Sequence, residues 1–126
     1  RTPTVRDYES ARRLLAHLRR LPRPLLVPYH PWYAVLSGSP PHYHLHGLND
    51  IRASKRPFPP QLEQQIRLGK YGAVVYDRRG RIYHRQLPGL TRRYRLHHDL
   101  RLFQTRTYTG NTCGPRFVWI PRATHP

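Results

Sequence analysis

Residues 25–38 read LLVPYHPWYAVLSG, and this order of apolar and turn-forming residues predicts how the fold is built. Residues 25–27 form a continuous apolar run, which is typical of a short strand buried on both faces of a sheet. Pro31 suits the first position of a helix, where its missing N–H needs no partner, and Gly38 suits the left-handed residue that ends one. The stretch therefore predicts a strand, a tight connection and a short helix.

Two further segments predict helices. Residues 8–21 place apolar side chains on one helical stripe and arginines on the other, with Asp7 as the N-cap and Pro22 as the stop. Pro60 begins a second helical pattern, which Gly69 ends. Both helices therefore have an apolar face to pack on a sheet.

Two more continuous apolar runs, residues 73–76 and 117–120, predict buried strands that lie next to residues 25–27 in one sheet. Weaker alternation favours extended chain at residues 42–51, 81–84 and 102–109. Residues 90–102 fit either a helix or a strand. Helices that alternate with short apolar strands predict an α/β fold: one small domain over residues 1–126, with a short, largely parallel sheet flanked by helices.

The charge is strongly positive, because 23 lysines and arginines stand against six acidic residues, a net charge of +17. We expect an anionic partner, which can be nucleic acid, anionic lipid head groups or a lipid-linked phosphosugar. All the cations except Lys55 and Lys70 are arginine, which suits bidentate phosphate contacts, although GC-rich coding gives the same bias.

Cys113 is the single cysteine, so an intrachain disulfide and a cysteine-based zinc site are excluded. The chain starts at Arg1 and contains no Met, so we expect a processed protein or a piece of a larger one.

Three histidines alternate in the polar, ring-rich segment that follows the first strand: His42, His44 and His46. On a strand they would share one face at a spacing of about 7 Å, and with His30 nearby a three-histidine metal site is conceivable. The prolines at 40–41 mark a loop instead, where alternation fixes no common face. We therefore assign no metal site here.

Asp50 and Asp77 each follow an apolar segment, and in open α/β sheets ligands bind at the carboxyl ends of strands. Two carboxylates could act as acid and base, but each could also cap a turn or pair with an arginine. No phosphate-binding loop or nucleophile motif accompanies them, so we assign no catalytic residue and no cofactor. His97 and His98 are adjacent, so they should face apart in either regular structure.

Arginine patches at residues 12–20, 77–81 and 91–101 interleave cations with rings, a pattern common on surfaces that bind single-stranded nucleic acid. The solvated face of a protein with GC-rich coding gives the same pattern. No RNA-recognition, KH or zinc-finger pattern accompanies it. A basic RNA-binding or ribosome-associated protein therefore stays as the alternative function.

The order of motifs resembles a known family. VPYHPWYAVLSG at residues 27–38, LHGLNDI, AVVYD at residues 73–77 and TG-x-x-x-x-P-x-FVWIPR at the end resemble the extramembrane C-terminal domain of polytopic membrane glycosyltransferases. These are relatives of the protein mannosyltransferases, the GT-C class. The matching closing residues are Thr109, Gly110, Pro115, Pro121 and Arg122. Ser39 departs from the family, which usually has lysine after the glycine.

The resemblance implies a parent enzyme that takes sugar from a polyprenyl-phosphate carrier. The catalytic aspartate of that class lies in an extracytoplasmic loop between membrane spans, which has no counterpart here. This chain would then be an accessory domain at the extracytoplasmic face, beside the transmembrane part of its parent, and would not transfer sugar by itself. Trp32, Tyr33, Tyr43 and the arginines suit a lipid–water interface. We expect the ligand-binding side chains to be His30, Trp32, Tyr33, His42, His44, His46, Asp50 and Asp77.

Overall fold

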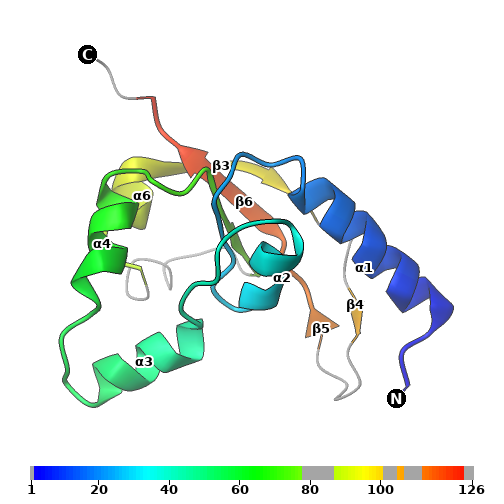
Figure 1. The fold of residues 1–126 in the computed structure, drawn as a ribbon, viewed down its shortest axis with the longest axis horizontal. Helices are drawn as coiled ribbons and strands as arrows, with labels where there is room; N and C mark the ends of the chain where they lie inside the picture. Colours follow the sequence, from blue (N-terminus) through cyan, green and yellow to red (C-terminus); the bar gives the residue numbers. More distant parts are fainter. Residues whose placement is uncertain (1, 78–86, 101–104, 107–111, 124–126) are drawn as a thin grey trace.

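The computed structural model describes residues 2–77, 87–100, 105–106 and 112–123 (Figure 1). The helices are α1 (Val5–Leu18), α2 (Pro31–Leu36), α3 (Leu45–Ala53), α4 (Pro60–Arg67) and α6 (Leu90–Arg93). The strands are β1 (Leu25–Leu26), β2 (Ala73–Tyr76), β3 (Tyr94–Asp99), β4 (Thr105–Arg106), β5 (Thr112–Cys113) and β6 (Phe117–Pro121).

Four strands form the main sheet in the order β1-β2-β6-β3, and β4 pairs with β5 separately. The small α/β domain is confirmed, and the three strands expected from apolar runs are neighbours as predicted. The sheet is mixed and not largely parallel as predicted. β1 and β2 are parallel, with Leu25 opposite Ala73, whereas β6 runs antiparallel to β2 and to β3. Parallel pairing of β1 and β2 requires a long crossover, and α2, α3 and α4 provide it.

Helices cover both faces of the sheet, which explains why its strands are continuously apolar. Leu25, Ala73 and Val75 pack with Leu14 and Leu18 of α1 and with side chains of α2. The alternate strand residues belong to a second cluster with side chains of α3, α4 and α6: Leu26, Val74 and Tyr76. Figure 1 shows α1 on the right of the sheet and α4 with α6 on its left. The result is three layers, with the sheet in the middle.

Most predicted helix ends agree with the structure. Gly38 and Gly69 adopt positive φ angles of 92° and 65° after α2 and α4, as expected. Both ends of α1 were predicted wrongly, because the helix was expected over residues 8–21 and runs over Val5–Leu18. Thr4 is the N-cap and accepts the Asp7 N–H, while the Asp7 carboxylate accepts from Thr4 N at 2.8 Å. This reciprocal capping box satisfies two backbone donors, so the helix begins before Asp7.

The prediction of extended chain at residues 42–51 is wrong, because α3 begins at Leu45. The side chain of His44 caps this helix by accepting the N–H of His46 at 3.1 Å. Leu45 and Leu48, three residues apart, are both buried in the core, which supplies the helical face. The three alternating histidines therefore do not share the face of a strand. Residues 90–102 form a short helix and then a strand as far as they are described, while residues 81–84 lie outside the described part.

Candidate functional site

A histidine–aspartate pair lies at the carboxyl edge of the two parallel strands. Asp77 directly follows β2, and His30 follows β1 at the start of α2. Because β1 and β2 are parallel, their carboxyl ends meet at one edge. His30 Nε2 lies 2.6 Å from Asp77 Oδ2, and the two side chains are only 11% and 20% exposed. We call these residues the His30–Asp77 pair.

The carboxylate of Asp77 has one oxygen engaged and one available. Oδ2 makes the short contact with His30, a length typical of a charge-assisted hydrogen bond. Oδ1 is buried and accepts no hydrogen bond from any residue in the described ranges. A buried acceptor without a donor costs free energy, which a donor from a ligand or a water molecule recovers. Oδ1 has almost no exposed surface, so a ligand hydroxyl reaches it only when the side chains that cover this edge move aside.

An aromatic surface adjoins this pair. The Trp32 ring lies 5.0 Å from the His30 ring, edge to face, and 6.0 Å from the Tyr33 ring. Tyr33 is buried, whereas 44% of Trp32 is exposed. The ring of Tyr29 lies 6.4 Å from that of His30. The edge thus combines an exposed indole with a fixed carboxylate, and the sequence predicted all of these residues except Tyr29.

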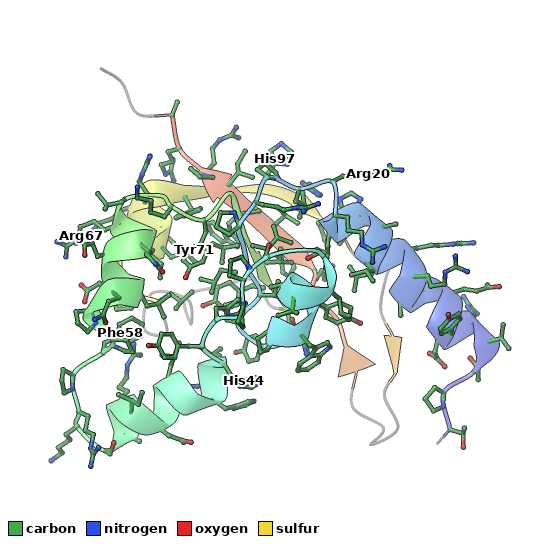
Figure 2. All side chains as sticks on the ribbon, in the orientation of Figure 1. Arg20, His44, Phe58, Arg67, Tyr71 and His97 are labelled. Carbon is green, nitrogen blue, oxygen red and sulfur yellow. The ribbon has the colours of Figure 1, made fainter. Side chains whose placement is uncertain are left out.

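His44, labelled in Figure 2, is the N-cap of α3, and His46 in the first turn of this helix lies next to Tyr29. Their rings stack at a centroid distance of 5.0 Å, and the His46 ring lies 6.2 Å from that of Tyr29. The pKa of His44 is lowered, first by burial and then by the neighbouring His46. His44 is therefore neutral at pH 7, and because its Nδ1 accepts the His46 N–H, the ring proton is on Nε2.

His42 and Asp50 lie in different surroundings. His42 Nε2 accepts the N–H of Val27 at 3.0 Å, and its Nδ1 donates to the Tyr43 carbonyl at 2.9 Å. This imidazole ties the end of the first strand segment to the loop before α3. Asp50 is exposed on α3, and no hydrogen bond or ion pair joins it to His30 or Asp77 in the described ranges. Within those ranges no group of three or more His, Cys, Asp or Glu side chains is arranged to hold a metal ion.

A basic hollow that the sequence did not predict lies between α4 and α6. Its volume is about 500 Å³, and it shares no lining residue with the His30–Asp77 pair. The lining residues are Glu63, Arg67, Pro88, Gly89, Thr91, Arg92 and Arg93. Three guanidinium groups against one carboxylate favour an anion here. The adjacent arginines at 92–93 are the one feature of the sequence that could have indicated an anion site, but only the fold brings α4 beside them.

No protein-family model, curated protein or solved structure matches this chain. None of the helices in the described part is both long and apolar enough to cross a bilayer. The geometry of the sheet edge is therefore the main basis for a functional proposal.

Proposed function

We propose that this chain is an accessory extracytoplasmic domain of a membrane glycosyltransferase, and that it recognises a polyprenyl-phosphate-linked sugar at the edge of its sheet. The observation that carries the proposal is the His30–Asp77 pair with the exposed Trp32 ring beside it. In this arrangement the domain binds the head of the lipid carrier, and the membrane part of the parent enzyme performs the transfer.

The pair suits the sugar. Ligand sites place a few fixed polar groups within a largely apolar or aromatic surface, and the polar groups set the orientation of the ligand. Asp77 Oδ1 supplies a buried acceptor for a sugar hydroxyl, since Oδ2 is held by His30. The indole of Trp32 supplies a flat apolar face for the C–H side of the ring. A sugar therefore meets two complementary surfaces at once.

The surroundings suit the phosphate and the lipid surface. The His46 ring lies against that of Tyr29 and can donate a hydrogen bond to a phosphate oxygen. The net charge of +17 attracts anionic head groups from a distance. Trp32 and Tyr43 are 44% and 52% exposed, and amphipathic rings are favoured at a lipid–water interface. The resemblance of residues 27–38 to glycosyltransferase domains points to the same ligand.

Isothermal titration with short-chain polyprenyl phosphates, with and without an attached hexose, tests this proposal. We expect the hexose to strengthen binding, and we expect Asp77→Asn and Trp32→Ala each to weaken it by about tenfold or more. Asp50→Asn is the matched control, because it removes an exposed carboxylate from α3 and should leave binding unchanged. Equal affinity of the wild type, Asp77→Asn and Trp32→Ala proteins for the hexose-bearing ligand would reject the proposal.

The hollow between α4 and α6 favours a second candidate, binding of single-stranded nucleic acid through phosphate contacts. In that case affinity for a short RNA should fall steeply with salt, and Arg67→Gln with Arg92→Gln should weaken binding. Asp77→Asn should have no effect on the RNA. The two candidates are thus separated by which variants reduce binding of which ligand.

A further inference from the structure

A bulge in β3 brings two histidines together that the sequence predicted to face apart. Leu96 pairs with Trp119 of β6 and His98 with the adjacent Val118, so His97 is an extra residue in β3. A bulge breaks the strict alternation of side chains. As a result the Nδ1 atoms of His97 and His98 are in contact, and the ring centroids lie 4.8 Å apart. The prediction for these two histidines was therefore wrong.

His17 of α1 meets the opposite edge of the His98 ring. The two Nε2 atoms are 3.1 Å apart, although the residues are separated by 81 positions in the sequence. His17 lies in the last turn of α1, between the fully buried Leu14 and Leu18. Both leucines belong to the same core cluster as Leu100, which follows β3. Two packed elements therefore hold these nitrogens opposite each other.

We propose that His17 and His98 form a two-histidine binding site for a borderline divalent metal ion, of which Zn²⁺ is the probe. Imidazole nitrogens bind zinc at about 2.0–2.1 Å, so two ligands of one ion lie about 2.9 Å apart at a right angle and about 3.4 Å apart at the tetrahedral angle. The Nε2 separation of 3.1 Å lies between these limits. The metal takes the place of the single proton that two neutral imidazoles share across this gap.

His97 orients one of the two ligands. When the metal occupies Nε2 of His98, the remaining proton of that ring is on Nδ1, which faces Nδ1 of His97. His97 can accept that hydrogen bond, and such a partner fixes the tautomer and the ring plane of a ligating histidine. Because no group of three ligands is present in the described ranges, water completes the coordination.

Charged groups near the site limit its affinity. Arg20 acts electrostatically on His17. The cation Arg20 opposes a second positive charge, and Asp99 is already bound to Arg116 at 2.7 and 3.0 Å. We therefore expect weaker binding than at a three-histidine site. Figure 2 labels Arg20 and His97 where the end of α1 meets this part of the sheet.

Thermal unfolding of the metal-stripped chain with Zn²⁺, and with Mg²⁺ as a control, tests the site. Zinc should raise the Tm by about 5 °C or more at saturation, and Mg²⁺ should not. His17→Gln and His98→Gln should remove the shift, and His97→Gln should weaken zinc binding by about 10-fold to 100-fold. His46→Gln should keep the full shift. The absence of a shift in the wild type, or its persistence in both His17→Gln and His98→Gln, would overturn the proposal.

A second measurement uses only the wild-type chain and so does not depend on the folding of any variant. Substoichiometric Cu²⁺ should broaden the ring NMR signals of His17, His97 and His98 before those of any other histidine. Broadening that starts at His44 and His46 would show that the metal binds elsewhere, and the site at α1 and β3 would be rejected.

Discussion

Replacing Tyr94 by phenylalanine should destabilise the protein by about 2–4 kcal/mol, although the ring stays the same size. The Tyr94 side chain is fully buried, and its hydroxyl accepts the N–H of Tyr71 at 3.1 Å and donates to the Tyr71 carbonyl at 2.9 Å. Burial is also the main cause that raises the pKa of Tyr94 to about 12, so the hydroxyl is protonated at any ordinary pH. Tyr94→Phe leaves two buried backbone groups without this partner, at about 1–2 kcal/mol each.

Urea unfolding followed by circular dichroism measures this loss directly. The midpoint should fall while the slope with denaturant stays constant, and the Tm should drop by roughly 10–15 °C. Tyr43→Phe is the matched control, because Tyr43 is 52% exposed, and it should change stability by less than about 0.5 kcal/mol. A loss of less than about 1 kcal/mol in Tyr94→Phe would mean that these two hydrogen bonds do not hold the segment leading into β2. The position of Asp77 at the end of β2 would then lack that support.

Two further predictions concern the backbone and the pH dependence. Gly72→Ala should lower the free energy of unfolding, measured in urea, by about 2 kcal/mol or more, because a Cβ there would lie 2.3 Å from the backbone oxygen of Pro22. Gly47→Ala is the control and should change this free energy little, because the space around Gly47 is open. Burial lowers the pKa of His42 below its ordinary value of 6.5, and Nε2 must stay unprotonated to accept the Val27 N–H. The unfolded chain therefore binds more protons than the folded one, so the free energy of unfolding should fall as the pH drops below 6.5. His42→Gln should make the free energy of unfolding depend less on pH between about pH 7.5 and about pH 5.5. If the free energy of unfolding depends on pH equally in the wild type and in His42→Gln, His42 is not a cause of that dependence.

The sequence predicts those parts of the fold that depend on local pattern. Continuous apolar runs located β2 and β6 because strands buried on both faces have no polar side to interrupt them. Pro31 and Gly38 bounded α2 correctly because their backbone preferences act locally. His30 and Asp77 were both expected among the ligand-binding residues, but their contact with each other was not predicted; it arises because two neighbouring parallel strands end at one edge.

Other features depend on contacts between distant segments, and these the sequence could not show. The helical spacing of Leu45 and Leu48 was hidden by histidines at every second position, and only burial against the core reveals it. The direction of β6 depends on its pairing with β2 and β3. The extra residue at His97 exists only in relation to β6, so its contact with His98 and the approach of His17 are tertiary effects.

The central claim is that the edge at His30 and Asp77 binds a lipid-linked sugar phosphate. Heteronuclear NMR of the wild-type chain during titration with a hexose-bearing short-chain polyprenyl phosphate tests it most directly, since the signals that move identify the binding surface. We predict that the Trp32 indole and the backbone signals of Asp77 and Tyr29 shift first, and that the phosphate without the hexose moves Trp32 less. Shifts confined to Arg67 and Arg92, with Trp32 and Asp77 unchanged at saturation, would contradict the claim and place anion binding in the hollow between α4 and α6.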